Sequence, residues 1–237
     1  MEPIEIWPTF GIRVTTPRLE LRAITPDLLF PMIELADAGI HDPATMPFLM
    51  PWTDVPPPDR QRDSLRFYWN MLATFRADAF RLMFAVFEDG TLVGTQDALT
   101  DQFPRLRTFE TGSWLGQRFQ GRGIGKEMRA AILHLMFEGL GAQRATTGAF
   151  ADNAPSIGVT TALGYEDNGV RTVLRRGVPA EERLFRMDRA AWVSTRRDDI
   201  TISGLDERCL AFLGLAPDLT SLDPPPAPSG DTSSGSG

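Results

Sequence analysis

Residues 110–126 read ETGSWLGQRFQGRGIGK, a strand-like run followed by a glycine-rich loop and the start of a helical pattern. Glycines at 121, 123 and 125 leave their backbone amides sterically open. These amides lie where the positive end of the following helix begins, which is a favourable place for an anion. The stretch therefore predicts a cradle for a phosphate group.

Basic residues reinforce this interpretation. Arg122 and Lys126, the only lysine in the chain, lie within the loop, and Arg118 and Arg129 are expected to extend the positive patch. The chain as a whole has a formal charge of −7, so a basic cluster here is a local feature.

The spacing of the loop excludes two common nucleotide motifs. A Walker loop needs glycine at position 120 and serine or threonine at 127, where this chain has Gln120 and Glu127. The dinucleotide fingerprint needs its third glycine at the position of Lys126. These mismatches disfavour a nucleotide-hydrolysing protein and leave the pattern Gln-x-x-Gly-x-Gly, which begins at Gln120.

The composition is that of an ordinary soluble globular protein, with 237 residues, of which 42% are hydrophobic and 23% charged. No apolar run approaches the roughly 18 residues of a membrane helix. One cysteine and two histidines cannot build a disulfide framework or the usual zinc site, so no metal is expected. The acidic balance argues against a nucleic-acid binder. The N-terminus lacks the pattern of a signal peptide, and a cytoplasmic location is expected.

Hydrophobic periodicity and turn residues predict a mixed α/β domain whose sheet is largely antiparallel. Asp89-Gly90 between two strand-like runs is a strong hairpin signal. The predicted elements are a strand at 16–23, a helix at 25–39, a proline-rich loop at 41–58, a helix at 59–79, strands at 81–87, 92–99 and 107–115, a helix at 128–139, a strand at 146–150, a helix at 154–163 and two strands around 175–177.

Three regions are expected along the chain. Residues 1–197 form the main domain, and residues 198–215 form a short helical extension. Residues 216–237 are rich in proline, glycine and serine and are expected to be disordered.

The chain resembles the GNAT superfamily of acyl-CoA-dependent N-acyltransferases, whose pyrophosphate loop has the pattern (Arg or Gln)-x-x-Gly-x-(Gly or Ala). Two other segments agree at the expected distances: Thr16-x-Arg18-Leu19-x-Leu21-Arg22 before the loop, and Asn153-x-x-Ser156 with Gly164-Tyr165 after it. These segments look like the RimJ/RimL branch of ribosomal-protein N-acetyltransferases, and the resemblance covers about residues 14–190. The loop HDPATMPFLMPWTD with GSWLG is similar to an actinobacterial subgroup that includes a mycobacterial succinyltransferase.

The resemblance implies the GNAT fold, in which a mixed, mostly antiparallel sheet has two splayed central strands and is flanked by helices. It implies acetyl-CoA or another acyl-CoA as co-substrate and an amine as acceptor. The strand before the loop then binds the pantetheine arm through its backbone, and the loop amides hold the pyrophosphate. The implied contacts are Ser113, Trp114, Leu115, Gln120, Gly121, Arg122, Gly123, Ile124, Gly125, Lys126, Asn153 and Ser156.

The resemblance also suggests how the reaction proceeds. The amine attacks the thioester directly, strand N–H groups stabilise the oxyanion, and a base takes the amine proton. Glu110 matches the acidic position of the branch and is the candidate base. Many GNAT enzymes have a tyrosine seven residues after the Asn as general acid, but this chain has Thr160 there. Ser156, Ser113 or water remain alternatives for the acid, and the thiolate leaving unprotonated is another.

The expected function is transfer of an acetyl or succinyl group from acyl-CoA to a primary amine of a protein or a small molecule. The missing tyrosine keeps a second hypothesis open, a degenerate GNAT that binds acyl-CoA as a sensor or structural module. His41, Trp52 and Trp69 are candidates for the acceptor pocket. The apolar character of the 41–58 loop suggests a homodimer or a larger homo-oligomer. Cys209 has no His or Asp companion suited to activating it as a nucleophile.

Overall fold

The computed structural model describes residues 1–215 and shows one nine-stranded sheet in the order β7-β8-β6-β5-β4-β3-β2-β1-β9. All neighbouring strands are antiparallel except β5 and β6, which are parallel. The strands are β1 (Arg13–Thr15), β2 (Leu19–Ala23), β3 (Arg81–Glu88), β4 (Thr91–Thr100), β5 (Thr108–Leu115), β6 (Arg144–Phe150), β7 (Glu166–Arg175), β8 (Val178–Asp188) and β9 (Thr201–Ser203).

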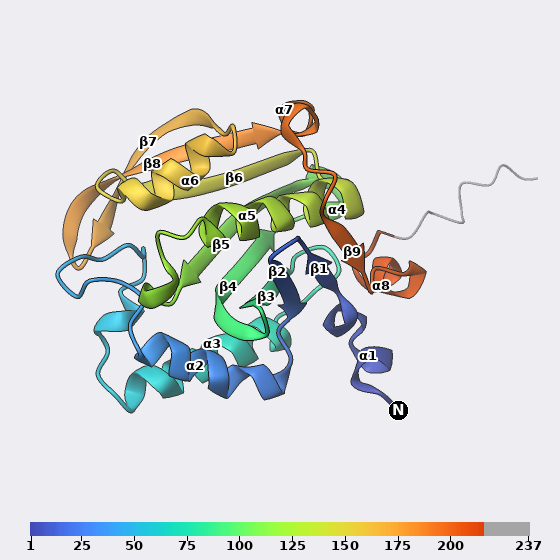
Figure 1. The fold of residues 1–237 in the computed structure, drawn as a ribbon, viewed down its shortest axis with the longest axis horizontal. Helices are drawn as coiled ribbons and strands as arrows, with labels where there is room; N and C mark the ends of the chain where they lie inside the picture. The colour runs from blue at the N-terminus through green and yellow to red at the C-terminus, as the bar shows by residue number, and fades with distance from the viewer. Residues whose placement is uncertain (216–237) are drawn as a thin grey trace, which may run out of the picture.

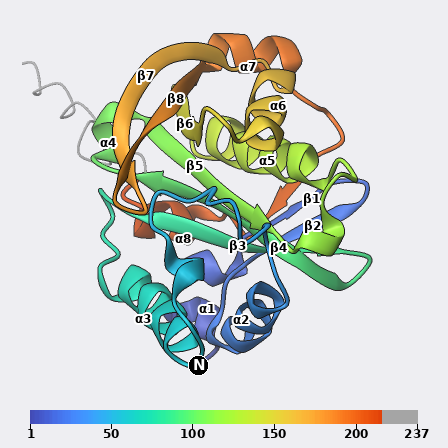
Figure 2. The ribbon, with the colours of Figure 1, turned by 90° about the vertical axis from the view of Figure 1, so that its left-hand side faces the viewer.

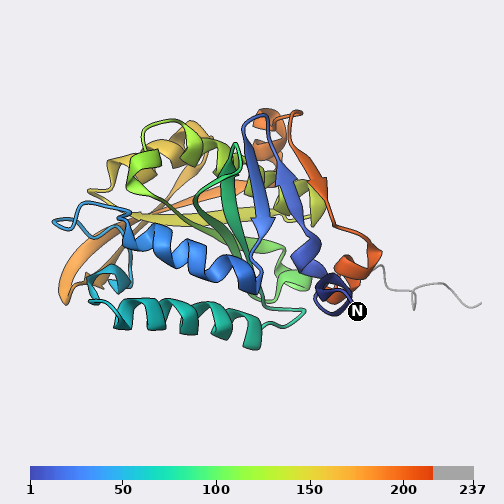
Figure 3. The ribbon, with the colours of Figure 1, turned by 60° about the horizontal axis from the view of Figure 1, so that its bottom comes forward.

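Helices cover both faces of this sheet (Figures 1 and 2). Helices α5 (Ile124–His134) and α6 (Ala154–Ala162) pack on one face, and α2 (Leu29–Asp37) and α3 (Asp59–Ala73) lie side by side on the other, as Figure 3 shows. The remaining helices are α1 (Pro3–Ile6), α4 (Phe103–Leu106), α7 (Arg189–Thr195) and α8 (Glu207–Phe212).

The two helix layers explain the burial pattern of the central strands. Four consecutive residues of β3, Phe84 to Phe87, are buried, whereas a strand with one wet face buries every second residue. The larger core lies between the sheet and α5, and it includes the fully buried rings of Phe84, Phe137 and Phe185. A smaller cluster around Met32 and Tyr68 lies under α2 and α3.

Most predicted elements are present, and their order follows the prediction. The hairpin at Asp89-Gly90 joins β3 and β4, and both residues have positive φ, as a tight two-residue turn requires. The predicted strand at 16–23 is shorter, because the chain turns after β1 and begins β2 at Leu19. The helix predicted to reach residue 79 ends at Ala73.

The segment 198–215, expected to be a short helical extension, contributes a strand as well as a helix. Strand β9 pairs with β1 at the edge of the sheet, and α8 buries Cys209 completely. The ring of Phe212 lies 5.2 Å from that of Trp7, so the end of the described chain packs against its beginning. Residues 216–237, expected to be disordered, lie outside the described residues.

Candidate functional site

Strands β5 and β6 are paired over only three residues and then separate. Thr108 to Glu110 pair with Arg144 to Thr146, and beyond Glu110 the strand β5 pairs only with β4. Figure 1 shows the two strands diverging toward the loop that precedes α5. Half of the backbone groups on the last five residues of β5 therefore lack a strand partner on the β6 side. This opening is the predicted splay.

The backbone groups of β5 alternate between β4 and the opening. The carbonyl oxygen of Trp114 lies against Gly94 of β4, where a Cβ on that glycine would stand, so this carbonyl faces β4. By alternation, Ser113 and Leu115 direct their backbone groups toward the opening. The Leu115 carbonyl accepts a hydrogen bond from Gln120 Nε2 at 3.0 Å, consistent with that direction. Of the three predicted backbone contacts, Ser113 and Leu115 face the opening and Trp114 does not.

The glycine-rich loop joins the end of β5 to the N-terminus of α5. Gly121 and Gly123 have φ of +73° and +80°, a region where a side chain is strained, and Gly123 is the residue before the helix. The N–H groups of Ile124, Gly125 and Lys126 then belong to the first turn, which has no intrahelical acceptors. The structure thus places open amides at a helix terminus, a geometry that suits the anion site predicted from the sequence.

The polar side chains of the loop bind to protein groups. Gln120 Nε2 also donates to the carbonyl oxygen of Ile40 at 2.7 Å, which fixes the loop to the segment after α2. Arg122 forms an ion pair with Glu88 at 2.7 Å. Contact of Gln120 with a pyrophosphate would therefore come from its backbone, and Lys126 is an exposed cation of the first turn.

A buried carboxylate anchors the start of α5. Glu127 is 8% exposed and accepts hydrogen bonds from Thr16 Oγ1 at 2.6 Å and from Arg18 Nε at 2.8 Å. Burial alone would raise the pKa of Glu127, but these hydrogen bonds and the Arg18 charge outweigh it and hold the pKa below 4.5. Arg18 also donates to the carbonyl oxygen of Arg122 at 3.4 Å. The Thr16 and Arg18 motif therefore holds the glycine-rich loop in place, a role that the sequence analysis did not assign.

The prediction that Arg118 and Arg129 extend the phosphate patch is wrong for Arg129. Arg129 is only 5% exposed and points at the sheet, because its helical position aligns it with the buried Ile132 and Leu133. Arg118 is exposed and lies over the ring of Phe119, 4.7 Å from its centroid.

The segment after β6 places Asn153 and Ser156 at the start of α6. Asn153 Oδ1 accepts a hydrogen bond from the Ser156 backbone N–H at 3.2 Å, so Asn153 caps the helix. Thr160, at the position of the missing tyrosine, is completely buried and donates to the Ser156 carbonyl oxygen at 2.9 Å. The Thr160 hydroxyl is therefore engaged within its own helix.

Glu110 is the last β5 residue paired with β6, so its carboxylate lies at the point where the strands separate. Desolvation raises the pKa of Glu110, although its side chain still reaches solvent; Arg171 lowers this pKa and Glu182 raises it further. Arg171 pairs with Glu182 at 2.5 Å. Glu110 has no ion-pair partner within residues 1–215, and its raised pKa makes its carboxylate more basic than an ordinary one.

Two of the three candidates for the acceptor pocket share an aromatic neighbour. The rings of His41 and Trp52 both contact Phe48, with centroids 5.6 and 5.5 Å apart. His41 Nε2 lies 2.8 Å from Thr53 Oγ1, so this contact links the start of the proline-rich loop to its later part. Trp69 lies on α3, is 54% exposed and contacts no aromatic ring among the described residues.

The proline-rich loop is held to the β7–β8 hairpin. Arg176 binds both carboxylate oxygens of Asp54, at 2.7 and 2.6 Å, and donates to the Pro43 carbonyl oxygen at 3.2 Å. The hydrogen bonds from Arg176 lower the pKa of Asp54. This contact joins two segments 122 residues apart beside the opening.

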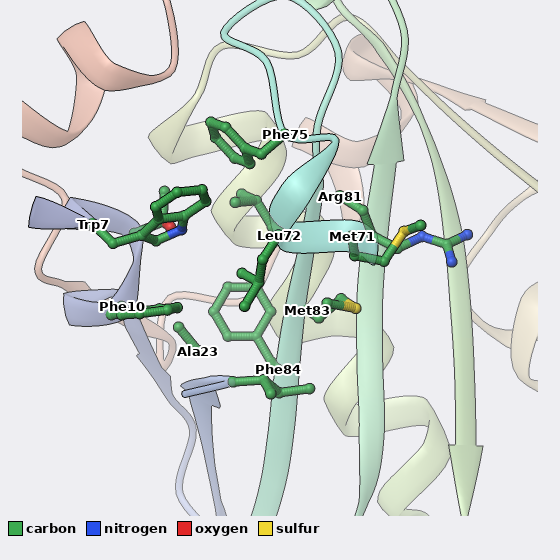
Figure 4. A pocket seen from close by; sticks show the side chains of 12 residues that line it. Trp7, Phe10, Ala23, Met71, Leu72, Phe75, Arg81, Met83 and Phe84 are labelled. Carbon is green, nitrogen blue, oxygen red and sulfur yellow. The ribbon is translucent and has the colours of Figure 1, made fainter. Parts of the chain in front are cut away.

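One cavity of the described chain lies away from this opening. This gap has a volume of about 20 Å³ and is lined mainly by apolar residues. Figure 4 shows Trp7, Phe10 and Phe75 around it, with side chains of β2, β3 and α3. None of its lining residues comes from β5, β6 or the glycine-rich loop. The gap has room for about one water molecule and is no acyl-CoA site.

Two further properties of residues 1–215 bear on the chemistry. Within them, no group of three His, Cys, Asp or Glu side chains is placed to hold a metal ion, and no helix is long and apolar enough to cross a membrane. Burial raises the pKa of the Cys209 thiol to about 11, so this cysteine is a poor nucleophile.

A parallel strand pair that opens above an acidic residue, with a glycine-capped helix beyond it, defines a protein of the acyl-CoA-binding acyltransferase class. Comparison with family models agrees, since residues 18–166 match the acetyltransferase (GNAT) domain. The chain belongs to this family.

Solved structures show the same fold at low sequence identity. RimL, the ribosomal L7/L12 alpha-N-protein acetyltransferase in complex with coenzyme A, is 16% identical with a TM-score of 0.62 over 73% of this chain and 95% of that one. Mycobacterium smegmatis RimJ in complex with a CoA disulfide is 20% identical, with a TM-score of 0.63 over 75% and 85%. The spermidine/spermine N-acetyltransferase SpeG from Vibrio cholerae is 15% identical, with a TM-score of 0.57 over 75% and 97%.

Proposed function

We propose that the protein transfers an acyl group from acyl-CoA to a primary amine by direct attack in a ternary complex. The observation that carries this proposal is the unpaired edge of β5, which leads from Glu110 directly to the open amides at the start of α5. An extended pantetheine arm has a backbone partner along this edge, and its pyrophosphate has an anion site at the end of it.

Glu110 is the proposed base. Its carboxylate lies at the bottom of the opening, has no ion-pair partner among the described residues, and has a raised pKa. It takes the proton of the attacking amine, directly or through a water. Ser113 and Leu115 supply backbone groups to the arm, and Asn153 with Ser156 lies at the α6 end of the opening.

The arginines of the 41–76 region bear on the choice of acyl group. A succinyl group, as in the actinobacterial subgroup that the sequence resembles, needs a cationic partner for its free carboxylate. Each arginine of this region is already ion-paired with an aspartate: Arg60, Arg62, Arg66 and Arg76. This pairing favours acetyl over succinyl as the transferred group.

The acceptor is an amine of a protein or of a small molecule. The structural relatives include a protein N-acetyltransferase and a polyamine N-acetyltransferase, and both acceptor kinds present an amine. The proline-rich loop with His41 and Trp52 and the β7–β8 hairpin form the proposed wall of the acceptor pocket. We also propose that this wall contributes to a homo-oligomer, because Leu49 and Met50 are exposed on it.

The decisive experiment is calorimetric binding of acetyl-CoA, succinyl-CoA and CoA, followed by thiol release with a panel of N-terminal peptides, polyamines and other small amines. Binding with release of CoA for some amine is the expected result. Tight binding without turnover on any amine would favour the alternative, a sensor or structural module, for which Thr160 in place of tyrosine is the supporting observation. No binding of any of the three would overturn the proposal.

A further inference from the structure

Arg129 places a buried guanidinium across the opening between β5 and β6. Its Nη2 donates to Ser113 Oγ of β5 at 3.1 Å, and its Nη1 donates to Thr147 Oγ1 of β6 at 3.4 Å. Both hydroxyl residues lie just beyond the last paired residues, Glu110 and Thr146. The guanidinium therefore spans the strands where they begin to separate, on the side of α5.

Arg129 forms no ion pair within residues 1–215, although its charge lowers the pKa of the buried carboxyl of Asp97. No carboxylate oxygen of residues 1–215 lies within 4.0 Å of its nitrogens, although the side chain is about as buried as the core around it. A buried cation is costly unless a negative group or a full set of hydrogen bonds compensates it. An anion that binds only during function would supply that compensation.

Unsatisfied polar atoms surround the guanidinium. Arg129 Nε, Thr111 Oγ1 and Tyr165 Oη are all buried and form no hydrogen bond of good geometry within residues 1–215, although Tyr165 lies within weak hydrogen-bonding reach of Thr111 and Arg129. Burial raises the pKa of Tyr165, and the neighbouring Arg129 and Thr111 lower it, which places the three groups together. Buried polar groups are nearly always satisfied in folded proteins, so three incompletely satisfied groups at one place leave hydrogen-bonding capacity that a ligand or a bound water can use.

The position of Arg129 along β5 identifies the part of the ligand that it meets. The pyrophosphate site is at Gly121 and Gly123, and the pantetheine arm runs from there along Leu115 and Ser113 toward Glu110. The thioester is at the far end of this arm. Arg129 is bonded to Ser113, which lies three residues from Glu110 and eight residues from Gly121, so its guanidinium is nearer to the expected place of the thioester than to that of the phosphates.

We propose that Arg129 stabilises the negative charge on the CoA sulfur as the thiolate leaves. This inference rests on the proposed function. The amine nitrogen forms a bond to the thioester carbon, the C–S bond breaks with its electron pair passing to sulfur, and the amine proton goes to Glu110. A guanidinium stays protonated in proteins, so Arg129 acts by its charge and not as a proton donor. It takes the place of the tyrosine that serves as general acid in many GNAT enzymes. Thr160, bonded within α6, does not serve as that donor.

The test measures the pKa of the CoA thiol while CoA is bound to the intact protein. The protein–CoA complex is titrated with pH, and the ultraviolet absorbance of the thiolate reports its ionisation. A neighbouring cation lowers a thiol pKa by about one unit or more. We expect the bound thiol of the wild-type complex to titrate at least one unit below free CoA. Arg129→Met should remove this shift, and Arg129→Lys should keep part of it. Arg13→Met, which removes an exposed cation of β1 far from β5 in the sheet, should leave the thiol pKa unchanged.

Several outcomes would overturn the inference. The inference is overturned if the thiol of CoA bound to the wild-type protein has the same pKa as free CoA. This result needs no variant, so it holds even if Arg129→Met fails to fold. An unchanged shift in Arg129→Met overturns the inference as well. Tighter binding of succinyl-CoA than of acetyl-CoA that disappears in Arg129→Met would instead assign the guanidinium to an acyl carboxylate. Failure of the wild-type protein to bind CoA at all would contradict the proposed function, and the two failures are thereby distinguishable.

Discussion

Arg18 and Glu127 are 109 residues apart in sequence, and their side chains meet through a hydrogen bond of 2.8 Å from Arg18 Nε to Glu127 Oε2. A second guanidinium nitrogen of Arg18 forms an ion pair with the same oxygen at 2.8 Å. Glu127 belongs to the first turns of α5, and Arg18 also reaches the carbonyl oxygen of Arg122 in the glycine-rich loop. The contact therefore links the N-terminal strands to the proposed pyrophosphate site.

Breaking this contact should weaken both the fold and CoA binding. Arg18→Ala and Glu127→Gln should each lower the free energy of unfolding by about 1–3 kcal/mol, because hydrogen bonds between charged groups are lost. Denaturant unfolding of both single variants and the double variant gives the coupling energy. Additive losses, with a coupling energy near zero, would show that the two side chains act independently. Arg13→Ala, which breaks an exposed pair with Glu20, is the control and should have little effect.

The pair should also make stability depend on pH. The pKa of Glu127 is lower in the folded protein than its usual 4.5, so its stabilising effect is present above the unfolded pKa and is lost as the pH falls through the folded pKa. We expect the difference in Tm between wild type and Glu127→Gln to be constant above pH about 5 and to shrink at lower pH. A difference that stays the same down to pH about 3 would contradict the assigned pKa shift.

The sequence predicted those features that depend on local chemistry. The Asp89-Gly90 turn predicted the β3–β4 hairpin, and the glycines of the loop predicted an open turn before a helix, because both depend on backbone conformations that a few residues dictate. The family resemblance implied the splay of two central strands, and the structure confirms it, because β5 pairs with β6 over only a short stretch.

Features that depend on distant partners were not predictable in this way. Strand β9 has three residues and no apolar period of its own, and it forms because β1 offers an edge to it. The role of Arg18 requires Glu127, which is far away in sequence. Arg129 was assigned to the phosphate patch by its charge alone, yet its spacing of three and four residues from Ile132 and Leu133 already indicated a buried helix face.

The glycine-rich loop predicts a specific loss of CoA affinity. Gly121 has φ of +73° with no atom within 4 Å of an added Cβ, so Gly121→Ala strains the backbone without creating a clash in the protein. We expect at least tenfold weaker CoA binding by calorimetry, about 1.4 kcal/mol, because the methyl group and the shifted amides disturb the anion site. Gly123 is less suitable, since its added Cβ would lie 3.6 Å from Arg18 Nη2.

Gly90→Ala is a matched control for this prediction. Gly90 has φ of +75° and also has no atom within 4 Å of an added Cβ, but it lies in the β3–β4 hairpin. The two substitutions should therefore lower Tm by similar amounts, and only Gly121→Ala should weaken CoA binding. Equal CoA affinities for the two variants would show that the pyrophosphate does not bind at this loop.

Replacement of Glu110 should affect turnover far more than binding. A base must be ionised to act, so activity rises with pH through the pKa of Glu110, which desolvation places above the usual carboxylate value. We expect Glu110→Gln to lower kcat by about 10²–10⁴-fold and to remove this acidic limb of the pH profile, with acetyl-CoA affinity unchanged. An unchanged kcat and pH profile would show that water or another group, and not Glu110, accepts the proton of the amine.

The bidentate contact between Arg176 and Asp54 predicts an effect on the acceptor alone. Arg176 holds the proline-rich loop through Asp54 and the Pro43 carbonyl oxygen, and neither residue touches β5 or the glycine-rich loop through a hydrogen bond. Loss of this clamp in Arg176→Ala should leave the wall with His41 and Trp52 less fixed, so the amine must order it on binding. We expect KM for the amine to rise several-fold, with CoA affinity and Tm nearly unchanged, because the pair is exposed.

Arg144→Ala, which breaks another exposed arginine–aspartate pair with Asp188, is the control. Steady-state kinetics with the amine varied at saturating acetyl-CoA measures the effect, and equal amine KM values for the two variants would exclude the loop from the acceptor pocket.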